Sequence, residues 1–182
     1  PSGPDGHRRI THFGTGSSHR LYPAGDATFQ SGTDLDSELP AAFRYQFTPG
    51  KGGQAGSLVI RETNKPARSA RRINLPEVAA HFKSGDAELF GKLILPTKTK
   101  DHGGRPLKTV IFVHGSDPTP SVDQEWLPHL LAANGIATFV FDKRGTGCSK
   151  GQYVQHFEVL ANDVLAAVAW LKARPEVDSN NI

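Results

Sequence analysis

Hydrophobic and polar residues alternate in the first part of the chain. Over 41–62, two strand-like runs flank a stretch rich in glycine, which predicts a β-hairpin. In the first run, Phe43, Tyr45 and Phe47 fall on one face. A third strand is predicted to include 70–73. No set of side chains typical of a catalytic site occurs in this β-rich part.

The pattern changes in the second part of the chain. "KSGDA" (83–87) separates two strand-like runs, which is a hairpin signal. Apolar runs of strand and helix length then alternate, which predicts a parallel sheet entered from an antiparallel hairpin. The fold class expected is therefore α/β, as a partial mixed sheet preceded by a small β-rich segment. The predicted elements are strands at 77–82, 88–95 and 108–115, a helix at 121–135, a strand at 136–142, a helix at 155–175 and the first residue of a further strand at Ile182.

Two of these elements carry specific expectations about burial. The nearly continuous apolar run at 108–115 is typical of a parallel strand buried on both faces. In the helix at 121–135, Pro128 predicts that the helix proper starts near that residue. The last helix is expected to bury an apolar stripe formed by Phe157, Leu160, Val164, Leu165, Val168 and Leu171.

Composition adds boundaries and exclusions. The 182 residues suit one domain with a smaller attached piece: a loose segment at 1–19, a β-rich segment at 20–75 and an α/β part at 76–182. The single cysteine excludes an internal disulfide and a cysteine-based zinc cluster. No apolar run is long enough for a membrane span, so no membrane partner is expected. Because the chain starts at Pro1, both a cytoplasmic and a periplasmic or secreted location stay open.

The net charge of +3 has an uneven distribution. The basic residues concentrate in "RETNKPARSARR" (61–72), which we interpret as a solvated strand and loop. Aromatic residues that could stack on bases are not interleaved with them, so no nucleic-acid partner is expected.

Three motifs resemble the α/β-hydrolase family. "VIFVHGS" (110–116), "FDKRGTGCS" (141–149) and the helix running to "LKARPEVDSNNI" (171–182) occur in the order and on the elements typical of that family. The resemblance covers roughly 76–182 and is nearest to the subgroup of dipeptidyl aminopeptidases, acylaminoacyl-peptidases and related esterases. It implies hydrolysis of a small-molecule or peptide ester or amide through an acyl-serine intermediate, without a cofactor.

The resemblance also implies roles for the first loop. His114 would be a structural support, Gly115 would allow a tight turn, and the backbone N–H of Ser116 would be the oxyanion-hole donor. Asp117 departs from the subgroup, which often has a second glycine there. We expect its carboxylate to point away from the site.

In the second loop, the resemblance implies residues that shape the rim of the site. Asp142 and Arg144 would pair with each other or with loop backbone, and Gly145 and Gly147 would allow the turn. Ser149 lies in "GCSKG" (147–151), a literal match to the Gly-x-Ser-x-Gly motif of serine hydrolases.

We nevertheless predict that Ser149 is a rim residue and not a nucleophile. A nucleophile elbow follows its strand directly, whereas four residues separate Asp142 from Gly147. The order Ser, acid, His also fails, because His156 is the only later histidine and precedes the candidate acids. The chain is thus expected to hold no nucleophile, and the resemblance then implies that it is the inactive N-terminal portion of a serine hydrolase. Because a half sheet would have an open edge, we also expect the isolated chain to self-associate.

Two other functions stay open. One is a non-catalytic binding module with this fold. The other is a fragment of a dinucleotide-binding oxidoreductase, suggested by Gly145, Gly147 and Gly151, although Asp163 would then lie inside a helix instead of at a strand end. No metal site is expected: His7, His12 and His19 fall in a polar segment without a metal-binding motif. Cys148 is expected to be a small buried or half-exposed residue.

Overall fold

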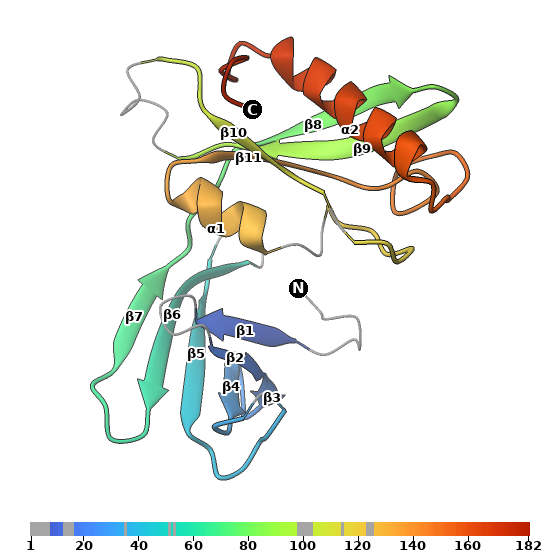
Figure 1. The fold of residues 1–182 in the computed structure, drawn as a ribbon. Coiled ribbons are helices and arrows are strands. Elements are labelled where there is room, and N and C mark those ends of the chain that lie inside the picture. Colours follow the sequence, from blue (N-terminus) through green and yellow to red (C-terminus); the bar gives the residue numbers. More distant parts are fainter. Residues whose placement is uncertain are drawn as a thin grey trace. The chain divides into compact units, whose positions relative to one another are not determined.

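The computed structural model describes residues 8–12, 17–34, 36–50, 52, 54–97, 104–113, 115–122 and 126–182 (Figure 1). The chain divides into two compact units, 1–72 and 73–182, and each is described by itself.

All the regular elements in the described residues of the first unit are β-strands. β5 (Phe43–Pro49) and β6 (Ala55–Glu62) form the predicted hairpin, and Tyr45 is fully buried between half-buried Phe43 and Phe47. The third strand, predicted at 70–73, lies slightly earlier, as β7 (Arg68–Arg71). The five-stranded antiparallel sheet has the order β3-β4-β5-β6-β7 and includes β3 (Tyr22–Pro23) and β4 (Thr28–Ser31).

The expectation of a loose segment at 1–19 was wrong for its described residues. β1 (Arg9–His12) and β2 (Ser17–Arg20) form an antiparallel ribbon. The ribbon packs on the sheet through imidazole rings, because the ring centroids of His12 and His19 lie 5.5 and 4.6 Å from that of Phe43. Histidine counts as a polar residue in a hydrophobicity pattern, so the pattern did not predict that these two side chains pack against Phe43.

The second unit contains the predicted mixed sheet. β8 (Glu77–Ser84) and β9 (Ala87–Ile94) form a hairpin, β11 (Ala137–Phe141) is antiparallel to β9, and β10 (Thr109–Phe112) is parallel to β11. The order across the sheet is β10-β11-β9-β8. The chain therefore combines an α/β part with a β-rich segment, as expected.

Two helices cover opposite faces of this sheet (Figure 1). α1 (Leu127–Ala133) starts beside Pro128, as predicted, and α2 (Phe157–Lys172) is the longer helix. Alternate side chains of β11 point to opposite faces of the sheet. Phe139 and Phe141 belong to the apolar cluster that includes Leu171 of α2, whereas Val140 belongs to the cluster that includes Ala132 of α1. Each face thus has its own apolar core. None of the helices in the described residues is long and apolar enough to cross a membrane.

One burial expectation was wrong, and a second was wrong for part of its residues. β11 is buried along its whole length, but β10 lies at the edge of the sheet, and Val110 is 40% exposed. On α2, the predicted stripe holds for Leu171, which is buried, and for Val164, which packs against the core, but Phe157 and Leu165 are 88% and 64% exposed. The buried residues of this helix are Asp163, Ala167 and Leu171, one turn apart, so the face that meets the sheet is rotated from the predicted stripe and includes a carboxylate.

The final residues run beside β10. Leu107 and Val177 form a parallel bridge, and the Thr109 N–H donates to the carbonyl of Asn181 at 3.0 Å. Ile182, expected as the first residue of a strand, has no strand assignment. The residues that precede Ile182 nevertheless run parallel to β10, along the edge that faces away from β11.

Candidate functional site

Two loops meet at the carboxyl ends of the adjacent parallel strands β10 and β11. The first spans 113–122, of which His114 lies outside the described residues, and the second spans 142–156. Ligands of open α/β sheets bind in the crevice at this edge. These loops hold all the site residues predicted from sequence, so their mutual contacts define the candidate site.

Asp142 fastens the two loops together. Its Oδ1 accepts the backbone N–H of Ser121 at 2.7 Å and of Val122 at 3.0 Å, and its Oδ2 accepts the N–H of Cys148 at 3.0 Å. Asp142 is buried, and three backbone donors satisfy its carboxylate. Of the two partners considered from sequence, the loop backbone is the one observed.

The motif glycines allow close approaches that a side chain would block. Gly147 has φ +53°, and a Cβ built on it would lie 2.1 Å from Asp142 Oδ2. Gly145 has φ +70°, and its Cβ would lie 2.4 Å from the backbone nitrogen of Tyr153. Both glycines are therefore required by conformation and by space.

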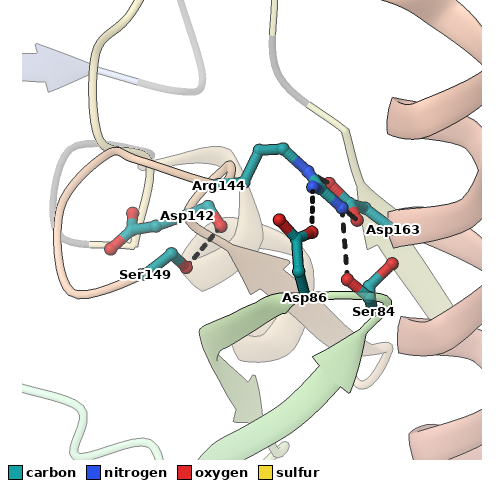
Figure 2. A network of polar contacts seen from close by, with 6 residues as sticks. All are labelled: Ser84, Asp86, Asp142, Arg144, Ser149 and Asp163. Carbon is teal, nitrogen blue, oxygen red and sulfur yellow. Dashed lines mark hydrogen bonds and ion pairs between the residues drawn. The ribbon is translucent and has the colours of Figure 1, made fainter. Parts of the chain in front are cut away.

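Arg144 points away from Asp142 and joins three elements (Figure 2). Its Nε and Nη2 donate to the Asp163 carboxylate of α2 at 2.9 and 2.6 Å. Its Nη1 donates to Asp86 in the β8–β9 turn at 3.1 Å, and Nη2 also reaches the Ser84 carbonyl at 3.3 Å. The bonds to Asp163 raise the pKa of Arg144 above its ordinary value. Arg144 therefore does not pair with Asp142.

Sequence reasoning missed Asp163 as a site residue. It is 1% exposed, and Arg144 occupies both of its carboxylate oxygens. An acidic residue among the otherwise apolar positions of a helix face would have been the available signal, because a buried carboxylate requires a partner. In the dinucleotide-binding alternative, the Asp163 carboxylate would bind a ribose hydroxyl, but both of its oxygens already accept hydrogen bonds from Arg144.

Ser149 holds the second loop against β9. Its Oγ donates to the Asp142 carbonyl at 2.7 Å and accepts the Phe90 N–H at 2.9 Å (Figure 2). The residue is buried. Both recorded partners of the hydroxyl are backbone groups, so within the described residues no histidine or carboxylate is bonded to it. That Ser149 is not a nucleophile stays a prediction.

The loop after β10 is held from the loop after β11. Lys143 Nζ donates to the carbonyls of Gly115 and Asp117. The carbonyl of Ser116 accepts from the Tyr153 hydroxyl and from Gln155 Nε2, the latter at 3.1 Å. Lys143, Tyr153 and Gln155 were not identified from sequence, and nothing in their spacing marks them. Ser116 itself is exposed.

Two side chains near Ser116 bear on its surroundings. Thr119 Oγ1 donates to Asp117 Oδ2 at 2.7 Å, so the carboxylate that departs from the family pattern is bonded within its own loop. Cys148 is a free, exposed thiol, in contrast to the buried or half-exposed residue expected.

The other histidine candidates lie in the first unit. The rings of His12 and His19 are 5.5 Å apart, and His12 Nε2 is 3.0 Å from the Tyr45 hydroxyl. His7 lies outside the described residues. Across the parts of the chain that the structure describes, no group of three or more His, Cys, Asp or Glu side chains could hold a metal ion.

Comparisons with known proteins give limited similarities. No family model matches, and no curated protein matches by sequence. A hypothetical protein from Pseudomonas aeruginosa is similar in structure, with a TM-score of 0.50 and 26% identity, over 59% of this chain and 34% of that chain. An esterase from Pyrococcus furiosus has a TM-score of 0.44 and 26% identity, over 56% and 39% of the two chains. An acylaminoacyl peptidase from Pyrococcus horikoshii has a TM-score of 0.45 and 18% identity, over 90% and 27%.

This chain thus spans from 27% to 39% of the length of these solved structures. Because the last two TM-scores lie below 0.5, neither likeness assigns an activity to this chain. The functional conclusion therefore depends on the residues and geometry of the chain itself.

Proposed function

We propose that this chain is the N-terminal portion of a serine hydrolase that cleaves an ester or amide bond through an acyl-serine intermediate. The observation that carries the proposal is the position of Ser116. It is exposed at the carboxyl end of β10, and its carbonyl is held by Tyr153 and Gln155 from the neighbouring loop. A fixed backbone donor at this edge suits a site in which negative charge develops on an oxygen.

Ser116 would act through its backbone N–H. When a serine hydroxyl attacks a carbonyl carbon, the C=O double bond becomes a single bond and its oxygen gains negative charge. An N–H already aimed at that oxygen stabilises this charge more than it stabilises the uncharged substrate. A general base takes the proton of the serine hydroxyl during the attack. Collapse of the intermediate restores the C=O and breaks the bond to the leaving group, which departs as the alcohol or amine after receiving that proton, and water then releases the acyl group by the same route.

The nucleophile is expected beyond Ile182. The segment 177–181 runs parallel beside β10, so a strand that continued it would extend the sheet at the β10 edge. From β10 the chain passes through α1 to β11, which lies on one side of β10. From β11 it passes through α2 to the segment 177–181, which lies on the other side of β10. The loop that holds Ser116 would then lie at a topological switch point, where α/β sheets bind their ligands.

A fluorophosphonate probe, which phosphonylates activated serine hydroxyls with loss of fluoride, tests this assignment. We expect no labelling of the 182-residue chain and labelling of a serine beyond Ile182 in a longer product of the gene. Downstream sequence should carry Gly-x-Ser-x-Gly, then an acid, then a histidine. The variant Ser149→Ala is the control and should still be labelled at the downstream serine. Labelling that depends on Ser149, or a longer product without an elbow serine, would reject the proposal in favour of a binding module.

A further inference from the structure

Lys143 is a buried cation that forms no ion pair with a carboxylate in the described part of the chain. The residue is 5% exposed, and Nζ donates to the carbonyl oxygens of Gly115 and Asp117. Nζ also lies 5.4 Å from the centroid of the Tyr153 ring, within the range of a cation–π contact. Burial of an ammonium group is unfavourable unless its donors are satisfied, so this lysine serves to hold the loop after β10.

The bond to Gly115 fixes the direction of the next N–H. The peptide between Gly115 and Ser116 is trans, since the one cis bond in the described residues joins Leu39 and Pro40. In a planar trans peptide the C=O and the following N–H point in opposite directions. A lysine bonded to the Gly115 oxygen therefore turns the Ser116 N–H away from itself.

The other side of Ser116 is held in the same way. Tyr153 and Gln155 bond its carbonyl oxygen, which fixes the peptide plane that follows. Two consecutive peptide planes are thus oriented by side chains of the loop after β11. The Ser116 N–H itself has no hydrogen bond to any residue in the described part of the chain, so it is available to a ligand.

We infer that Lys143 is a positioning residue, which aims the Ser116 N–H at an anionic or oxyanionic oxygen bound at the carboxyl end of β10. This inference rests on the proposed function for the nature of that oxygen. The orientation of the N–H by Lys143 is independent of it. Lys143 also brings a positive charge to a loop that carries the Asp117 carboxylate, and so favours negative charge nearby.

The first measurement uses this chain and the variant Lys143→Met, with Lys150→Met as the matched control. Lys150 belongs to the same loop but is exposed and bonds Glu88 at 2.9 Å. Residual dipolar couplings report the direction of each N–H bond, and ¹⁵N relaxation reports its order. In Lys143→Met we expect an altered Ser116 coupling and an order parameter that falls from about 0.85 to below about 0.6. Ser121 and Val122, held by Asp142, should keep their values.

The second measurement uses the longer gene product and an ester substrate. Lys143→Met should lower kcat by about 10- to 100-fold with little change in KM, because the donor acts on the transition state. Affinity for a boronate inhibitor should fall in parallel, and Lys143→Arg should recover part of both. Lys150→Met should leave all three values unchanged.

The outcomes separate the inference from the proposed function. If wild type shows no hydrolysis and no fluorophosphonate labelling, the proposed function fails, and the dipolar couplings alone decide whether Lys143 aims the N–H. Unchanged Ser116 couplings in Lys143→Met overturn the inference, whatever the activity. Altered couplings with an unchanged kcat in an active enzyme overturn its catalytic part.

Discussion

Arg144 and Asp163 form a buried ion pair that joins the loop after β11 to α2. The guanidinium donates to both carboxylate oxygens, at 2.6 and 2.9 Å, and both residues are buried. Because Arg144 also reaches Asp86 in the β8–β9 turn, one side chain connects the loop, the helix and the hairpin. The geometry of the candidate site therefore depends on a contact that reaches α2 and the β8–β9 turn.

Asp163→Asn is expected to lower the free energy of unfolding of this chain by about 3 kcal/mol, because the buried Arg144 keeps its charge and loses its main partner. Urea unfolding monitored by circular dichroism measures the change. The double variant Arg144→Met/Asp163→Leu should lose less, since it removes both charges.

The exposed pair between Lys150 and Glu88 supplies the control for the same loop. Lys150→Met should change the urea midpoint little, because water screens that pair. If Asp163→Asn unfolds at the wild-type midpoint, the buried pair does not hold α2 to the loop.

A second prediction concerns the contact between Gly147 and Asp142. Gly147→Ala should destabilise the chain by about 2 kcal/mol or more, because the new Cβ overlaps Asp142 Oδ2 and φ is positive. Gly85 is the matched control: its φ is +58°, close to the +53° of Gly147, but nothing lies within 4 Å of its Cβ position. Gly85→Ala should lose only about 1 kcal/mol, the cost of the left-handed backbone. Equal losses in urea unfolding would mean that the overlap with Asp142 does not matter.

A third prediction concerns pH and His12. Burial lowers the pKa of His12 below its ordinary 6.5, and His19 and Arg68 lower it further, against an opposing effect of Glu62. A histidine with a lowered folded-state pKa favours the neutral form. Its contribution is complete above pH 6.5 and is lost as the pH falls through the folded-state pKa. The first unit should therefore be less stable at pH 5.5 than at pH 7.5.

His12→Gln provides the comparison, because an amide can still bond the Tyr45 hydroxyl but does not titrate. The dependence of the unfolding midpoint on pH between 7.5 and 5.5 should be weaker in this variant. The pKa of Glu62 is also lowered, chiefly by its bond to Lys65, but from 4.5, so its contribution is lost only at more acidic pH. An unchanged slope in His12→Gln would show that His12 does not set the pH dependence.

The sequence predicted those parts of the fold that periodicity encodes. The β8–β9 hairpin, the alternation in β5 and the helix start beside Pro128 follow from local pattern. The exposure of Val110 was not predictable in this way, because an apolar run does not reveal that its strand lies at a sheet edge. The rotated face of α2 was missed because a hydrophobic pattern counts Asp163 as an exposed polar position. Its burial depends on the ion pair with Arg144, which the pattern does not show.

The candidate site divides in the same way. The apolar runs predicted strands that end just before Ser116 and at Asp142, and the resemblance to the α/β-hydrolase family suggested the roles of these two residues. The contacts of Lys143 and Tyr153 with the loop after β10 span 26 to 37 positions in sequence. Such contacts depend on how two loops meet across parallel strands, and a single sequence carries no local signal for them.

The last prediction concerns the open edge of β10, which we expect to make the isolated chain self-associate. The segment 177–181 covers this edge at Leu107 and Thr109, and beyond that Val110 and Val113 are 40% and 59% exposed. An unpaired apolar edge strand is a template for pairing with a second copy. Sedimentation velocity should show concentration-dependent oligomers.

Val113→Lys should shift the chain toward monomer, because a charged side chain on an edge opposes strand pairing. Leu165→Lys is the control: Leu165 is 64% exposed but lies on α2, away from the edge. If Leu165→Lys dissociates the oligomer and Val113→Lys does not, then the chain associates through the exposed face of α2 and not through the β10 edge. A monomeric wild-type chain over the whole concentration range would show that the edge is protected in some other way.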